Sequence, residues 1–223
     1  MSTSTLVSNK VRVLIADDSG FMRLLIRDII TSDDTIEVVG TASNGREAAE
    51  LTKSLNPDVV LLDMVMPEYD GLFAVKKIME ESPTPIVVLS SLGNTNINPI
   101  MQSMQYGAFD YLNKPVKGSA KLRDIQRELV EKVHIASKTD LQTLRNNAAA
   151  RNVNPHVFAD DLNYEIIVIG SSTGGPSALE KIVSNLPSNL AVPVLIAQHM
   201  PENFVPSFAL RINSMVPLDV KVG

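Results

Sequence analysis

The chain has 223 residues, 44% of them hydrophobic, a formal net charge of −5 and no cysteine. The length suffices for one full domain and part of a second. The negative charge disfavours a nucleic-acid surface, and the missing cysteine excludes disulfides, thiolate zinc sites and a cysteine nucleophile. No apolar run approaches the ~20 residues of a membrane span and the N-terminus lacks a secretory signal, so we expect a cytoplasmic protein without membrane insertion.

Short apolar runs alternate with amphipathic segments through more than half of the chain. Strands are predicted at 11–16, 36–41, 59–63, 86–90 and 109–113, and helices near 21–29, 46–55, 72–81, 98–105 and 119–137. Five such units in succession predict a flavodoxin-like α/β fold with a doubly wound parallel five-stranded sheet. We place this domain at residues 10–133.

Polar residues stand where four of these strands end: Asp17 and Asp18, then Asp63, Ser90 and Lys114. A single aspartate after a strand is usually only a cap or turn residue. Three carboxylates at one sheet edge repel each other unless a hard divalent cation neutralises them, and Mg²⁺ suits such oxygen ligands. Asp63 is then a candidate phosphoryl acceptor, with Lys114 and Ser90 as contacts for phosphoryl oxygens.

A connector and a second unit follow. Residues 134–163 lose their periodicity around Asn154-Pro155, and we predict a linker there. A new strand begins near Glu165 and leads into a glycine-rich turn and a helix from about Ser177. Residues 164–223 are therefore predicted to be a partial parallel α/β domain.

The glycine-rich turn reads Gly170-Ser171-Ser172-Thr173-Gly174. It fits neither a dinucleotide fingerprint nor a phosphate-binding P-loop. Its spacing fits a nucleophile elbow that projects Ser172, with Thr173 and Gly174 at a helix N-terminus that favours developing negative charge. A glycine-rich turn without a catalytic role would be about as common.

The next strand ends in Gln198-His199-Met200-Pro201, which places His199 at the same sheet edge as Ser172. A lone histidine at a strand end is more often structural. The pair therefore carries more weight than either residue.

Two resemblances follow from these motifs. Asp17-Asp18, Leu62 to Pro67, Asp70-Gly71, Ser90 and Lys114-Pro115 resemble the receiver domain of bacterial response regulators. The resemblance implies the following roles: Asp63 as phosphoacceptor, Asp18 as main magnesium carboxylate with Asp17 assisting, the Val65 carbonyl as a further ligand, Ser90 as switch hydroxyl, Lys114 as phosphate contact and Tyr111 as rotating aromatic. On propensity alone, Tyr111 is as well explained as a packing residue.

The second resemblance rests on Gly170 to Gly175 and on Gln198 to Pro201, which are similar to the catalytic domain of chemotaxis protein-glutamate methylesterases of the CheB type. It implies that Ser172 attacks receptor glutamate methyl esters and that His199 acts as base and then acid. It also implies deamidation of receptor glutamines. The implied partners are a chemotaxis histidine kinase and the cytoplasmic domains of methylated chemoreceptors, and the unphosphorylated receiver is expected to cover the esterase site.

The chain departs from that family at the third triad residue. The family's aspartate lies well beyond the histidine, and Asp219, the last acid here, does not match it. We therefore expect a truncated, three-stranded catalytic unit that leaves Phe204, Phe208 and Leu210 partly exposed. The alternative function is a phosphoacceptor receiver and binding protein with an inactive esterase unit. A DNA-binding output is disfavoured, since no basic patch follows the receiver.

Overall fold

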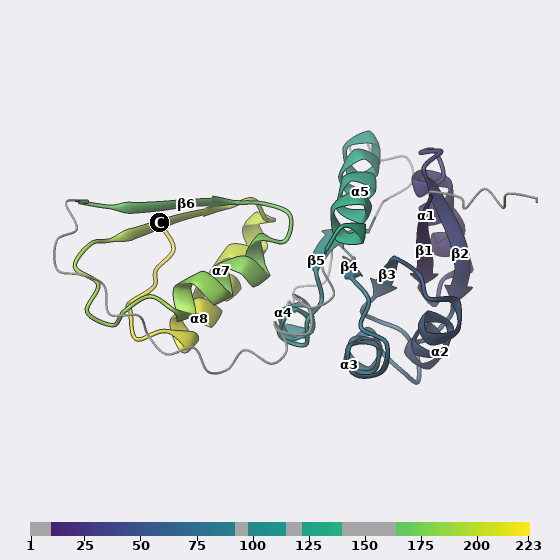
Figure 1. Ribbon diagram of the computed structural model, residues 1–223, viewed down its shortest axis with the longest axis horizontal. Helices are drawn as coiled ribbons and strands as arrows, with labels where there is room; N and C mark the ends of the chain where they lie inside the picture. Colours follow the sequence, from purple (N-terminus) through teal and green to yellow (C-terminus); the bar gives the residue numbers. More distant parts are fainter. Residues whose placement is uncertain (1–9, 92–97, 115–121, 140–163) are drawn as a thin grey trace, which may run out of the picture.

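The computed structural model describes residues 10–91, 98–114, 122–139 and 164–223. Most of the predicted linker, 134–163, lies outside the described residues. Figure 1 shows a five-stranded sheet flanked by helices, and beside it a two-stranded sheet with its own helices. Among the helices of the described ranges, none has the length and apolar character needed to cross a membrane.

The first body alternates strands with helices. Its strands are β1 (Val11–Ala16), β2 (Ile36–Ala42), β3 (Val59–Asp63), β4 (Ile86–Ser90) and β5 (Asp110–Asn113). Its helices are α1 (Gly20–Ile30), α2 (Gly45–Leu55), α3 (Gly71–Glu81), α4 (Asn98–Gln105) and α5 (Leu122–Ser137). The strands are all parallel in the order β2-β1-β3-β4-β5. The predicted flavodoxin-like fold is thus confirmed, and its ligand-binding edge lies beyond the ends of β1 and β3.

The central strands bury both of their faces because successive side chains point to opposite sides of the sheet. Val13 and Ile15 of β1 pack with α1 and α5, whereas Leu14 and Ala16 pack with α2, α3 and α4. Continuous apolar runs therefore form the strands, and the first polar residue falls just where each run ends. This geometry places the candidate site residues at one edge.

Local capping fixes where the helices of this body begin. The side chains of Ser19, Asn44 and Asp70 accept hydrogen bonds from the backbone N–H groups of Met22, Glu47 and Phe73, respectively. Each cap satisfies one of the free amides at a helix N-terminus. Since α1 and α3 are the elements that follow the acidic strand ends, their caps also hold the loops that carry the site.

The second body contains β6 (Ile167–Ser171), α7 (Gly175–Ser184), β7 (Val194–Gln198), the 3₁₀ helix η1 (Glu202–Phe204) and α8 (Val205–Met215). Its two strands are parallel and in register from Ile167–Val194 to Ser171–Gln198. The expectation of three strands in 164–223 was wrong, because residues 216–223 form neither strand nor helix.

The expected exposure of Phe204 and Phe208 is also wrong. Their side chains are only 2% and 6% exposed, whereas Leu210 is 71% exposed as expected. The receiver covers Phe204, whereas Phe208 lies with Val183 and Ile196 inside the second unit. Phe204 lies 5.1 Å from Tyr111 of β5, centroid to centroid, and both phenylalanines share one hydrophobic core with Ile100 and Met104 of α4.

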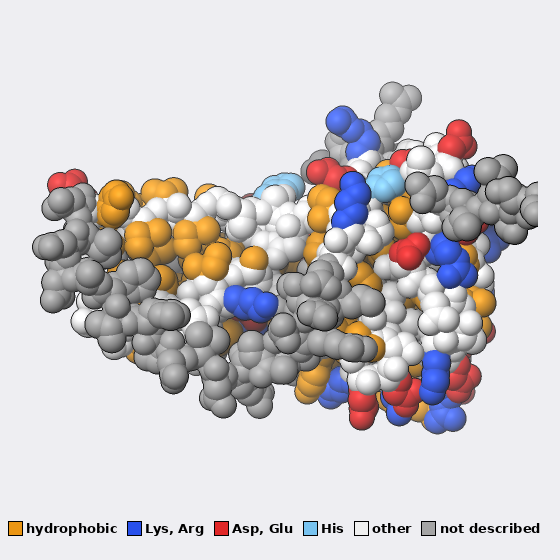
Figure 2. Space-filling view, viewed as in Figure 1, with side chains coloured by type: hydrophobic (Ala, Val, Ile, Leu, Met, Phe, Trp, Pro, Cys, Tyr) orange, Lys and Arg blue, Asp and Glu red, His pale blue; other side chains and the backbone are white. Residues whose placement is uncertain are grey.

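The opposite face of the two-stranded sheet is open. Val168 of β6 and Leu195 of β7 point away from α7 and α8 and are largely exposed. Figure 2 shows exposed hydrophobic side chains over this body, while charged side chains gather over the first. Parallel sheets are normally covered on both faces.

Candidate functional site

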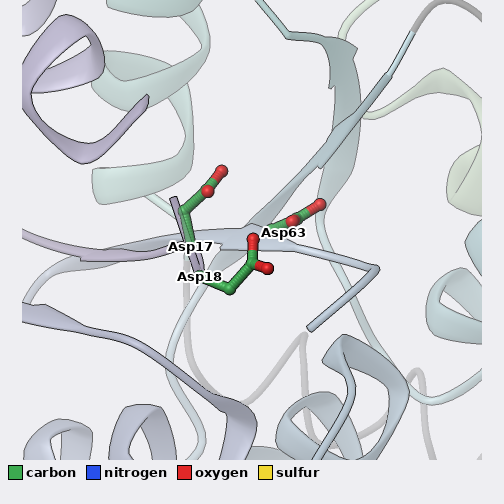
Figure 3. A group of neighbouring side chains, drawn as sticks. All are labelled: Asp17, Asp18 and Asp63. Atoms are coloured by element: carbon green, nitrogen blue, oxygen red, sulfur yellow. The ribbon is translucent and has the colours of Figure 1, made fainter. Parts of the chain in front are cut away.

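Three carboxylates meet at the carboxyl edge of the first sheet. Asp17 and Asp18 follow β1 and Asp63 is the last residue of β3; one carboxylate oxygen from each lies within 4.8 Å of the others. Figure 3 shows that Asp18 and Asp63 approach each other from neighbouring strand ends. Asp17 and Asp63 are buried and Asp18 is exposed. The three acids that the sequence singled out are thus brought together.

Lys114 joins this cluster from the end of β5. Its Nζ atom lies 2.8 Å from Asp17 Oδ2 and 2.7 Å from Asp63 Oδ2. Burial raises the pKa of the Asp63 carboxyl, and the contact with Lys114 opposes that rise without cancelling it. Burial lowers the pKa of the Lys114 ammonium, but its contacts with Asp17 and Asp63 outweigh burial and raise it.

The cluster suits a divalent cation. Three carboxylates and one ammonium leave two negative charges uncompensated. Among the described residues, the partner of the buried Asp17 Oδ2 is the Lys114 ammonium, at 2.8 Å. An all-oxygen donor set of this charge fits a hard cation.

Val65, Ser90 and Tyr111 surround the cluster less directly. The Val65 backbone N–H donates to Asp63 Oδ1 at 3.3 Å, which places its peptide beside the phosphoacceptor candidate. Ser90 is buried at the end of β4. Tyr111 is buried in β5, burial raises the pKa of its phenol, and its hydroxyl has no hydrogen-bond partner among the described residues. Among the described residues, no hydrogen bond or ion pair joins Ser90 or Tyr111 to Asp63, so their switch roles stay predictions.

Two supporting residues were not assigned a role from the sequence. Arg23 of α1 donates through one guanidinium nitrogen to the backbone carbonyls of Asp17 and Asp18, at 2.7 and 3.2 Å. A Cβ atom on Gly71 would lie 2.3 Å from the carbonyl oxygen of Asp63. The Asp70-Gly71 pair is one of the receiver motifs in the sequence, but the close approach of Gly71 to Asp63 is seen only in the tertiary structure.

A second constellation lies at the carboxyl ends of β6 and β7. Ser172 Oγ lies 3.5 Å from His199 Nδ1, and both side chains are exposed. The turn after Ser172 is closed by the Gly175 N–H, which donates to the Ser172 carbonyl at 2.7 Å. Gly174 has φ 71°, a conformation that favours glycine. The chain thus forms the predicted strand-turn-helix, and the distance suits a nucleophile and its base in a resting enzyme.

Gln198 fixes these two strand ends and was missed as a site residue. Its side-chain nitrogen donates to the carbonyls of Ser172 and His199 at 3.1 and 2.9 Å, and its side-chain oxygen accepts from Ser171 Oγ at 2.7 Å. A Cβ atom on Gly175 would lie 2.0 Å from Gln198 Oε1, so glycine there makes room for this amide. The sequence feature that could have indicated a role for Gln198 is its position directly before His199.

The third member of a triad is not among the contacts of His199. Within the described ranges, no hydrogen bond or ion pair connects a carboxylate to its ring. Asp219 instead pairs with Lys221 at 2.7 Å, and both side chains are exposed.

Comparison with known proteins decides the family. The family model for the response regulator receiver domain matches residues 13–126, which is more than half of the chain. The chain belongs to the response regulator receiver family. The receiver domain of Thermotoga maritima CheB has a TM-score of 0.54 and 39% identity, and covers 59% of this chain and 98% of its own. The receiver domain of NarL from Mycobacterium tuberculosis has a TM-score of 0.51 and 31% identity, and covers 59% and 99%.

The second body matches the CheB methylesterase family model over residues 167–222. The protein-glutamate methylesterase/protein-glutamine glutaminase of Archaeoglobus fulgidus is 43% identical over 95% of this chain and 61% of its own length. The Thermotoga maritima protein of the same name is 39% identical over 95% and 61%. The chain therefore spans about three fifths of the length of these relatives, and the predicted resemblance to CheB-type methylesterases is confirmed.

Proposed function

We propose that this protein is a phosphorylation-regulated chemotaxis enzyme that hydrolyses glutamate methyl esters on chemoreceptors and deamidates glutamines there. One observation carries the proposal: Ser172 Oγ lies 3.5 Å from His199 Nδ1 in a unit packed directly against a receiver. The family supplies the substrate class, since relatives with both units are named protein-glutamate methylesterase/protein-glutamine glutaminase.

In the receiver, Asp63 accepts the phosphoryl group from a chemotaxis histidine kinase. Asp17, Asp18, Asp63 and the Val65 carbonyl would hold Mg²⁺, which would neutralise charge on the phosphoryl oxygens. Lys114 contacts both buried carboxylates and is placed to take up a phosphoryl oxygen in exchange. Ser90 donates to another such oxygen, and Tyr111 carries the change towards the second unit.

In the second unit, Ser172 attacks the ester carbonyl while His199 takes its proton and then gives a proton to methanol as it leaves. Water hydrolyses the resulting acyl-serine by the reverse proton path. The N–H groups of Thr173 and Gly174, at the start of α7, stabilise the oxyanion. The substrates are cytoplasmic domains of methylated chemoreceptors, and the proposed setting is accordingly the cytoplasm.

Methanol release from a methylated chemoreceptor fragment, with Mg²⁺ and acetyl phosphate present, tests the proposal. Turnover that is lost in Ser172→Ala and kept in Ser184→Ala, an exposed position at the end of α7, is the expected result. Asp63→Asn should retain only the unstimulated rate. Equal turnover in the Ser172→Ala variant would contradict the esterase assignment. Phosphorylation of Asp63 without any methanol release would favour the alternative, a receiver with an inactive esterase unit.

A further inference from the structure

Helix α7, which follows Ser172 directly, has no cap from a neighbouring side chain. Its N-cap residue is Gly174, which has no side chain that could cap the helix. In contrast, the side chains of Ser19, Asn44 and Asp70 cap α1, α2 and α3. The free amides of this N-terminus are the positive end of the helix dipole. They are also the groups assigned above to the oxyanion.

The receiver supplies the missing cap. The Gly174 N–H donates to Asp110 Oδ2 of β5 at 2.9 Å, across a sequence separation of 64 residues. Asp110 is only 2% exposed, and the same oxygen lies 2.7 Å from Lys132 Nζ of α5. Asp110 Oδ1 accepts from the Tyr111 N–H at 2.8 Å. The carboxylate is thus rigidly held by β5 and α5 and directed at the elbow of the second unit.

We propose that Asp110 is an autoinhibitory residue of the esterase: in the closed form its carboxylate occupies the Gly174 amide that the reaction's oxyanion requires. The inference rests on the proposed function and names the contact by which the receiver acts on that site. With the Asp110 carboxylate bound there, the Gly174 N–H and the positive end of the α7 dipole already stabilise one anion. A second negative charge forming at Ser172 would then be repelled by the first.

The position of Asp110 couples this contact to the phosphorylation site. It directly precedes Tyr111, whose ring packs on Phe204, and β5 continues to Lys114, which contacts Asp63. A phosphoryl group on Asp63 that draws Lys114 and Tyr111 towards it shifts the short β5 strand. The Asp110 carboxylate shifts with that strand, and the Gly174 amide is released.

Hydrogen exchange of the Gly174 amide in the whole chain measures this contact without depending on turnover. Beryllofluoride with Mg²⁺, a mimic of the phosphoryl group, should accelerate exchange about tenfold, which corresponds to the loss of one hydrogen bond. The same addition to Asp63→Asn should leave the exchange unchanged. These comparisons alter nothing at Asp110, so they stand even if a variant there folds poorly.

Substitutions at Asp110 separate its charge from its shape. Asp110→Ala should accelerate Gly174 exchange about tenfold, whereas Asp110→Asn, which keeps an acceptor oxygen, should retain most of the protection. Labelling of Ser172 by a fluorophosphonate builds charge on a phosphoryl oxygen. Asp110→Ala, which frees the Gly174 amide, should speed it by about tenfold, and Asp110→Asn, which keeps that bond but loses the charge, should speed it less. A purely structural role would instead slow labelling in both variants.

Gly174 exchange that ignores beryllofluoride in the wild-type chain would overturn the inference, as would unchanged exchange in a folded Asp110→Ala. Neither result would bear on whether Ser172 hydrolyses methyl esters. Conversely, absent methanol release with the predicted exchange behaviour would remove the proposed esterase activity and leave the contact between the two units in place.

Discussion

Gly71 begins α3 at the point where the chain turns away from the phosphoacceptor candidate. A Cβ atom there would lie 2.3 Å from the Asp63 carbonyl and 2.7 Å from Met64 Cα, both of them backbone atoms that cannot easily move. Gly20, which begins α1 in the same way, would place its Cβ in ordinary contact, 3.6 Å from the Arg23 side chain. The two glycines therefore form a matched pair.

We expect Gly71→Ala to lower the free energy of unfolding by about 1–3 kcal/mol and to slow phosphorylation of Asp63, because the loop must shift. Gly20→Ala should change stability by less than about 1 kcal/mol in either direction. Urea unfolding followed by circular dichroism gives both values. Equal losses in the two variants would show that the close approach at Gly71 is not the cause.

Asp33 lies in the turn between α1 and β2, and its carboxyl makes the stability of the receiver depend on pH. The Thr35 hydroxyl, then the His134 ring, then the Thr35 N–H lower the pKa of Asp33 from 3.8 to about 2. A lowered pKa means that these contacts stabilise the folded chain above pH 3.8, and that this contribution is lost as the pH falls towards about 2. Thr35→Val should return the Asp33 pKa towards 3.8, and His134→Ala should do so less. Carbon-detected NMR titration of the carboxyl follows it; an unchanged midpoint in Thr35→Val would refute the assignment.

At the scale of elements, β6 and β7 hold their functional ends together through one amide. Gln198 bonds the carbonyls on both strand ends, and those strands carry Ser172 and His199. We expect Gln198→Leu to slow fluorophosphonate labelling of Ser172 by about tenfold, because small displacements of catalytic groups cost much of their effect.

Gln126→Leu is the control for that measurement, since its amide bonds the Ser32 hydroxyl of the receiver, away from Ser172. Its labelling rate should equal that of the unaltered chain. Rapid labelling in Gln198→Leu would mean that strand pairing alone, from Ile167–Val194 to Ser171–Gln198, is enough to place the two residues.

At the scale of the whole molecule, the receiver and the second unit share a hydrophobic core. Phe204 is 2% exposed against Tyr111, while Leu210 on α8 is 71% exposed. We expect Phe204→Ala to cost about 3–5 kcal/mol at this contact and Leu210→Ala less than about 0.5 kcal/mol. Thermal unfolding of the two variants compares them. Similar, small shifts in Tm would mean that the two units are not packed in this way in solution.

Much of the receiver could be predicted from local pattern. Buried parallel strands appear in the sequence as apolar runs, and the polar residues that end those runs meet at one edge of the sheet. The sequence alone therefore predicts that Asp17, Asp18, Asp63 and Lys114 lie together. The same reasoning paired Ser172 with His199. The sequence pattern did not identify Arg23 and Gln198. Both donate hydrogen bonds to backbone carbonyls, and every residue has such a carbonyl, so the sequence does not show which one accepts the bond.

The sequence by itself determined the alternating strands and helices of the receiver, their parallel arrangement and the sets of residues at each strand edge, because periodicity and strand direction are local properties. Only the tertiary structure decided what covers what. Phe204 reads as exposed because its burial depends on the surface that a distant segment presents, here Tyr111 of β5. The bond from Asp110 to Gly174 joins groups 64 residues apart, and no periodicity links them. That contact exists because two separately formed units pack face to face.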